Sequence, residues 1–109
     1  MTIREISQVI EASLVSGDDQ ASFDGVYVGD LLSRAMSHVG ADNLWVTIMA
    51  NANVVAVATL TEPAAVILAE NVELQAEALK AAMENGITVL RSPLSAYEIC
   101  VSIGKEIGA

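Results

Sequence analysis

The chain has 109 residues, of which 53% are apolar and 4% aromatic, and this predicts a single domain over residues 1–109 with an aliphatic core. Its net charge of −9 and its five scattered cations argue against nucleic acid or an anionic membrane surface as a partner, because both require clustered Lys and Arg. A single cysteine, no signal-peptide pattern and no apolar run of membrane-spanning length predict a soluble cytoplasmic protein without disulfides.

The N-terminal segment is expected to form a helix followed by two short extended segments. Residues 2–11 place their apolar side chains on one stripe, and Thr2 with Glu5 fits a capping box at the helix start. Extended segments are expected at residues 13–16 and 22–28, where they would form a short antiparallel element.

A second helix is predicted between Asp30 and Gly40. Asp30 is the expected N-cap, and Gly40 is the expected C-cap glycine. His38, the only histidine, falls in the last turn, where a surface role is favoured over catalysis because no acid or nucleophile is near it in sequence.

Two apolar runs at the centre of the chain predict buried strands at residues 44–49 and 65–68. Two interpretations of the segment between them are open. Asn51 and Asn53 are good N-caps for a short helix, whereas the β-branched valines that follow also fit a hairpin strand at residues 54–60. The helix is preferred, because a hairpin would leave the parallel strands without a crossover.

The C-terminal part alternates helix, strand and helix. A helix is predicted over residues 71–85, with Asn71 as its cap, Gly86 at its end, and an inner face formed by Val72, Ala76, Leu79 and Met83. A strand follows at residues 87–90. Ser95 and Glu98 form a second capping box, flanked by a hydrophobic staple of Leu94 and Ile99.

The fold class follows from this order of elements. Strands that begin near residues 44, 65 and 87 alternate with helices and are continuously apolar, as expected for strands covered on both faces. The chain is therefore predicted to be α/β, a three-layer sandwich with a mostly parallel central sheet and helices on both faces.

No constellation for catalysis is present. There is no phosphate-binding P-loop, no dinucleotide glycine fingerprint and no cluster of metal ligands, so no cofactor, no metal and no enzymatic activity are expected. Ser92 and Ser95 lack a histidine base, and Cys100 is expected to be a buried, inert thiol.

The candidate binding site rests on geometry. Ligands of parallel sheets sit beyond the carboxyl ends of the strands, where helix starts offer free amides. The residues there predict a neutral or weakly anionic ligand held by hydrogen bonds, although the same residues can serve only as helix caps. These candidates are Gly29, Asp30, Asn51, Asn53, Ser92 and Ser95.

Three motifs occur in order along the chain: YVGDLLS at residues 27–33, NVVAVA at 53–58 and PLSAYE at 93–98. With these motifs the chain resembles the DRTGG domain family, and the likeness extends over residues 2–107. The run that names the family is here QASFDGV at residues 20–26, with one glycine of the pair, Gly25, and without the arginine. An anion contact made through that arginine is therefore not expected in this chain.

The resemblance implies a role rather than a reaction. The family is similar to the N-terminal domain of HPr kinase/phosphorylase and occurs as an accessory domain in phosphotransacetylases and CBS-domain pyrophosphatases. It implies a non-catalytic regulatory module that binds a small molecule or a partner protein and forms a homodimer. The alternative is a purely structural dimerisation domain without a ligand, and an enzyme is the least favoured interpretation.

Overall fold

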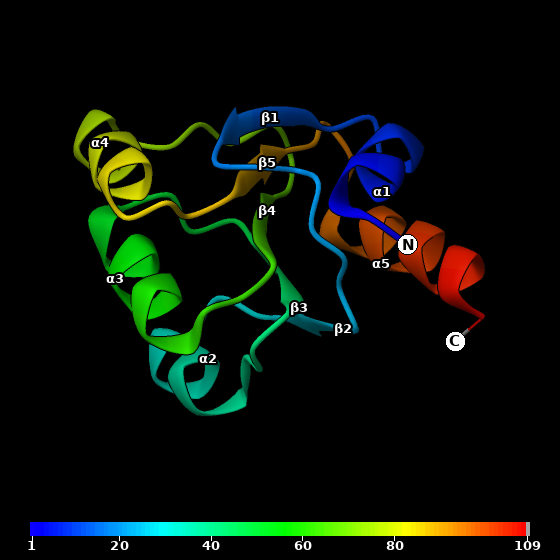
Figure 1. The fold of residues 1–109 in the computed structure, drawn as a ribbon, viewed down its shortest axis with the longest axis horizontal. Coiled ribbons are helices and arrows are strands. Elements are labelled where there is room, and N and C mark those ends of the chain that lie inside the picture. The colour runs from blue at the N-terminus through cyan, green and yellow to red at the C-terminus, as the bar shows by residue number, and fades with distance from the viewer. Residues whose placement is uncertain (109) are drawn as a thin grey trace.

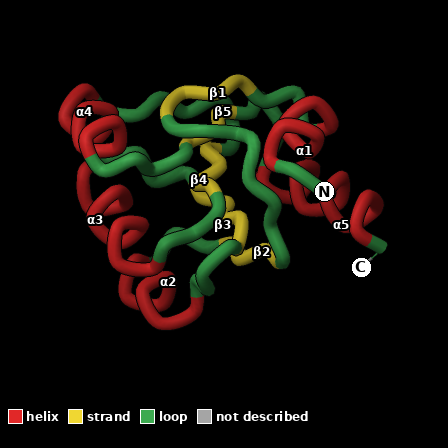
Figure 2. Tube along the Cα trace, in the orientation of Figure 1, coloured by secondary structure: helices red, strands yellow, loops and turns green. Residues whose placement is uncertain are grey.

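Five strands form one sheet in the order β1-β5-β4-β3-β2, and helices cover both of its faces (Figures 1 and 2). The computed structural model describes residues 1–108. The strands are β1 (Ser13–Ser16), β2 (Gly25–Val28), β3 (Asn43–Thr47), β4 (Ala65–Leu68) and β5 (Val89–Arg91). The helices are α1 (Ile3–Val9), α2 (Leu32–His38), α3 (Ala52–Thr61), α4 (Ala76–Glu84) and α5 (Ala96–Ile107).

The helices divide unequally between the two faces of the sheet. One apolar cluster joins the sheet to α2, α3 and α4, and its largest side chain, Trp45, is completely buried. A second cluster joins the opposite face to α1 and α5 through isoleucines such as Ile6 and Ile99. The predicted three-layer α/β sandwich with a mostly parallel sheet is confirmed, since β2, β3, β4 and β5 run parallel and only β1 is antiparallel.

Three helix starts follow the predicted capping chemistry. Thr2 and Glu5 make both hydrogen bonds of a capping box at α1, and Ser95 and Glu98 do the same at α5. Asn51 caps α3, because its side-chain oxygen accepts hydrogen bonds from the amides of the first turn. The helix between β3 and β4 is thereby confirmed over the alternative hairpin.

The antiparallel element predicted at residues 13–28 is wrong. Strands β1 and β2 lie at opposite edges of the sheet, with β1 antiparallel to β5 and β2 parallel to β3. The connection between them is held against the start of α1, where Ile3 and Arg4 donate backbone hydrogen bonds to Ala21 and Asp19. This segment therefore runs from one edge of the sheet to the other instead of closing a hairpin.

Two boundaries of α2 differ from the prediction. Asp30 is not the N-cap, since Leu31 occupies that position without a side-chain hydrogen bond. The helix ends at His38, and its cap is Val39 in an extended conformation, so Gly40 is not a C-cap glycine. Instead, the Gly40 amide donates a 2.7 Å hydrogen bond to the Asn43 side chain, which ends the helix through contact with the next strand.

The helix predicted from residue 71 begins five residues later, at Ala76. Asn71 is in a left-handed conformation (φ 60°) and Gln75 precedes the helix without a side-chain cap. The buried side of α4 is formed by Ala78 and Ala82, while Met83 is 65% exposed, so the predicted inner face is wrong there. Small side chains on this stripe let α4 pack closely against α3.

Candidate functional site

Two of the candidate residues join the carboxyl ends of β2 and β3. The Asp30 carboxylate accepts hydrogen bonds from the Thr47 hydroxyl at 2.7 Å and from the Ile48 amide at 2.9 Å. The carbonyl of Gly29 accepts a 3.0 Å hydrogen bond from the Trp45 indole. Asp30 uses one carboxylate oxygen to hold the ends of these two neighbouring strands together.

The two candidate asparagines lie at the start of α3, beyond the end of β3. The side-chain oxygen of Asn51 accepts from the Asn53 amide at 3.1 Å and from the Val54 amide at 3.4 Å. Asn53 lies in the first turn of the helix with an exposed side chain. Asn51 therefore serves the fold as a cap, and Asn53 presents its amide group to solvent.

The candidate serines follow β5, and β4 separates them from the strand end at Asn51. Ser92 is completely buried, and its hydroxyl donates to the Ile10 carbonyl at 2.7 Å and accepts from the Leu94 amide at 3.1 Å. The Ser95 hydroxyl accepts from the Glu98 amide at 3.1 Å. Both hydroxyls thus make hydrogen bonds within the fold, and a ligand role for the six candidates stays a prediction.

Arg91, at the end of β5, was not among the candidates. Its side chain is 29% exposed, its Nε donates a 3.1 Å hydrogen bond to the Asn71 carbonyl, and its Nη2 lies 3.3 Å from Oε1 of Glu73. The signal available in the sequence was a cation directly after the apolar run at residues 87–90 and directly before Ser92. Such a position is unusual, because charged residues are seldom buried unless paired.

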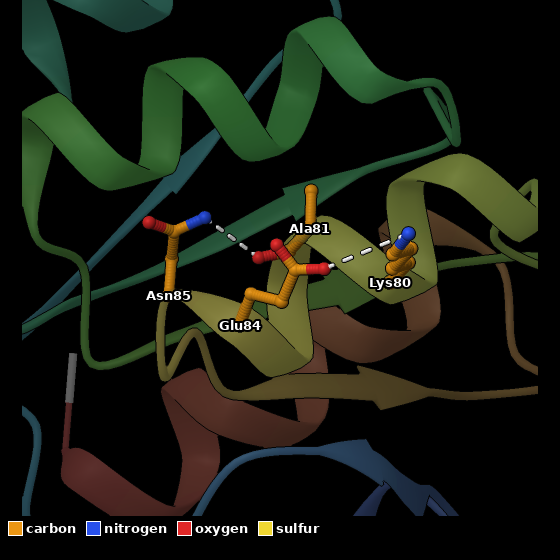
Figure 3. Close-up of polar contacts among 4 residues, drawn as sticks. All are labelled: Lys80, Ala81, Glu84 and Asn85. Carbon is orange, nitrogen blue, oxygen red and sulfur yellow. Dashed lines mark hydrogen bonds and ion pairs between the residues drawn. The ribbon is translucent and has the colours of Figure 1, made fainter.

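The polar contacts of α4 lie at the surface, and the thiol of Cys100 is a poor nucleophile. Lys80 lies 4.0 Å from Glu84 on the exposed side of α4, and Asn85 donates a 2.8 Å hydrogen bond to the Ala81 carbonyl (Figure 3). Burial raises the pKa of the Cys100 thiol, which favours the unreactive protonated form. Within residues 1–108, no three His, Cys, Asp or Glu side chains are grouped closely enough to hold a metal ion.

An apolar surface extends from the edge strand β2 to α5. Val28 is 51% exposed on β2, and Tyr97 is 77% exposed on α5. Between the two elements lies a groove of about 340 Å³, lined by Gly25, Val26, Cys100, Ile103, Gly104 and Ile107. We call this region the β2–α5 surface, and its exposed apolar residues are Val26, Val28, Tyr97, Val101 and Ile107.

Comparisons with known proteins agree with this fold. The model of the DRTGG domain family matches residues 5–105. Among solved structures, the chain is similar to the CBS and DRTGG domains of the regulatory region of Clostridium perfringens pyrophosphatase, complexed with its activator diadenosine tetraphosphate. The TM-score is 0.74 at 13% sequence identity, and the match covers 94% of this chain and 45% of that one, or about half its length. At this identity the likeness shows a shared fold.

A search of curated proteins gave no match. None of the helices within residues 1–108 has the length and apolar character needed to cross a membrane.

Proposed function

The chain belongs to the DRTGG domain family, and we propose that it is a non-catalytic regulatory module that self-associates through the β2–α5 surface and binds a small molecule or a partner protein. The structural relative supports the regulatory role, since it comes from the regulatory region of a pyrophosphatase that is complexed with a small-molecule activator.

The observation that carries self-association is the unequal covering of the sheet. Within residues 1–108, three helices cover one face, and two helices, α1 and α5, cover the other. Side chains alternate along a strand, so Tyr27 packs under α2 and α3 whereas Val26 and Val28 point to the less covered face. Val26 lines the groove beside α5, and Val28 is exposed on the same face of β2, so this region offers an apolar surface of the kind that marks interaction sites.

The position of β2 in the sheet supports the same conclusion. Strand β2 is the last strand in the order, so its outer edge has no strand neighbour among residues 1–108. An unpaired edge offers free backbone donors and acceptors to another chain, and proteins usually protect such edges. A second copy placed on the β2–α5 surface would cover the edge and the valines together.

Sedimentation velocity tests the proposal at micromolar to high micromolar concentration. The parent chain is expected to form a dimer, and Val28→Asp is expected to be a monomer because a carboxylate would be desolvated in the interface. Leu60→Asp is the matched control, since Leu60 is 69% exposed on α3, away from this surface, and should leave the dimer intact. A monomeric parent chain, or equal behaviour of the two variants, would contradict the proposal.

The alternative function is a structural dimerisation domain that binds no ligand. A thermal-shift screen with nucleotides and small metabolites separates the two, because a ligand specific for the folded state raises its stability by mass action. For a compound found in this way, Asn51→Ala and Asn53→Ala test the predicted position at the start of α3. If both variants stay folded and bind as tightly as the parent chain, the ligand binds elsewhere.

A further inference from the structure

A second cavity lies at the other edge of the sheet, remote from β2. It has a volume of about 260 Å³ and lies between β1, the end of β5 and α4. In Figure 1, the segment that leads from β4 into α4 passes beside β1. The cavity has three aliphatic side chains and one ion pair in its lining: Val15, Leu74, Leu79, Arg91 and Glu73.

The guanidinium of Arg91 is fixed independently of its ion pair. Its Nε donates to the carbonyl of Asn71, and the amide of Asn71 in turn donates a 2.8 Å hydrogen bond to the carbonyl of Ser92. These bonds connect the base of the β4–α4 segment to the end of β5. The hydrogen bond to Asn71 does not involve Glu73, so it remains available to orient Arg91 when Glu73 leaves.

Glu73 is a weak partner for Arg91. Its side chain is 76% exposed, and exposed ion pairs contribute little because water solvates both charges. Its carboxylate nevertheless occupies a position on the guanidinium that suits a carboxylate from outside the chain. An incoming acid can take this position at small cost, with the Glu73 side chain returning to solvent.

We propose that this cavity binds a small monocarboxylate with a short aliphatic body, whose carboxylate replaces Glu73 on Arg91. The aliphatic walls formed by Val15, Leu74 and Leu79 suit the apolar body. Among the residues that the structure describes, Arg91 is the one cation in the lining of this cavity, and the chain as a whole has a net charge of −9. These charges favour a monoanion over a dianion such as a phosphate monoester. The volume is below the range typical of drug-sized ligands, so the body is limited to a few carbons.

This cavity is separate from the position at Asn51 and Asn53. It rests on the proposed regulatory function, for which it gives a ligand class, and it does not depend on self-association. The test is a titration of the ¹⁵N-labelled chain with sodium hexanoate at constant ionic strength, followed by amide chemical shifts. Saturable shifts are expected at Val15, Leu74, Leu79 and Arg91. Hexan-1-ol lacks the charge and butyl phosphate carries a dianion, so both should bind at least about tenfold more weakly.

Variants of the ion pair give opposite expected results. Arg91→Gln should weaken hexanoate at least about tenfold, and Arg91→Lys should weaken it less because Lys keeps the charge but loses the planar fork. Glu73→Gln should tighten binding about 1.5- to 5-fold, which is the affinity equivalent of an exposed ion pair. Glu77→Gln removes the same charge from the exposed first turn of α4 and should change the affinity less.

Four results would overturn the inference. They are the absence of saturable shifts, shifts centred outside the cavity, equal binding of hexanol, and equal effects of Glu73→Gln and Glu77→Gln. If Arg91→Gln fails to fold, the comparison of the two exposed glutamate variants still decides the question. Sedimentation velocity on the same samples measures self-association separately, so failure of one proposal does not imply failure of the other.

Discussion

The carboxylate of Asp30 accepts a 2.7 Å hydrogen bond from the hydroxyl of Thr47 across the ends of β2 and β3. Thr47 is almost completely buried, while Asp30 lies at the surface and accepts a second hydrogen bond from the Ile48 amide. Among residues 1–108, β2 has a strand neighbour on one side only, so these hydrogen bonds of Asp30 help to hold the edge strand in the sheet. The β2–α5 surface therefore depends on a polar contact at one end of β2.

Removing the Asp30 carboxylate should destabilise the fold. Asp30→Ala leaves the buried Thr47 hydroxyl and the Ile48 amide without their acceptor, and we expect a loss of about 1–3 kcal/mol in the free energy of unfolding. A double-mutant cycle with Thr47→Val in urea should give a coupling energy of at least about 0.5 kcal/mol. Additive effects of the two substitutions would show that the bond does not hold the strands together.

The capping box at α5 gives a second prediction. Ser95→Ala removes the hydroxyl that accepts from the Glu98 amide and should cost about 1 kcal/mol of unfolding free energy. Ser33→Ala, at an exposed position within α2, is the control and should change stability by less than about 0.5 kcal/mol. An unchanged denaturation midpoint for Ser95→Ala would mean that the cap contributes nothing.

The same capping box predicts a pH dependence. The Ser95 amide and hydroxyl lower the pKa of Glu98 from its ordinary 4.5, and the Thr2 amide and hydroxyl lower the pKa of Glu5 in the same way. A lowered pKa in the folded state means that the stabilisation is complete above the unfolded pKa and is lost as the pH falls through the folded pKa. Stability should therefore decrease as the pH falls through about 4.5, where half of the glutamate side chains of the unfolded chain are protonated.

Side-chain NMR titration checks the origin of this dependence. Ser95→Ala should raise the pKa of Glu98 only part of the way to 4.5, because the backbone amide of residue 95 still donates to the carboxylate. The pKa of Glu5 should not change in that variant. A Glu98 pKa that is unaffected by the substitution would assign the whole shift to the backbone.

Alanine substitutions at two glycines with positive φ distinguish the cost of backbone strain from the cost of a steric clash. A Cβ added at Gly17 (φ +83°) would lie 2.5 Å from Cα of Thr88, whereas one added at Gly86 (φ +65°) would meet nothing within 4 Å. Gly86→Ala should therefore cost about 1–2 kcal/mol for the left-handed backbone alone. Gly17→Ala should cost about 1–3 kcal/mol more in thermal or urea unfolding, and equal costs would show that the chain around Thr88 yields.

Local signals in the sequence were sufficient for much of the fold. The apolar run at residues 65–68 has the same limits as β4, and Asn51 caps α3 as expected, since both depend on neighbouring residues. The partners of β1 and β2 could not be predicted in this way. Pairing between distant strands depends on how the whole chain closes, and β1 pairs with β5 through residues that lie far away in sequence.

The same limit explains why the partners of the candidate site residues were not predicted. Asp30 looked like a helix cap, because its true partner, Thr47, is 17 residues away. Ser92 looked available to a ligand, although its hydroxyl bonds to Ile10, which is 82 residues away. Arg91 belongs to no recognisable sequence motif, and its position in the lining of a cavity depends on the conformation of the β4–α4 segment. Side-chain partners across such separations are set by tertiary structure.

The most direct test of self-association is an isotope-filtered NOE experiment on a dimer made from labelled and unlabelled chains. It detects only contacts between protomers. If the β2–α5 surface is the interface, intermolecular NOEs should connect the methyl groups of Val26, Val28, Val101 and Ile107, while the exposed methyl groups of Leu60 and Met83 should give none. A dimer whose intermolecular NOEs come from Leu60 or Met83, or a sample with no such NOEs at high micromolar concentration, would contradict the assignment of this surface.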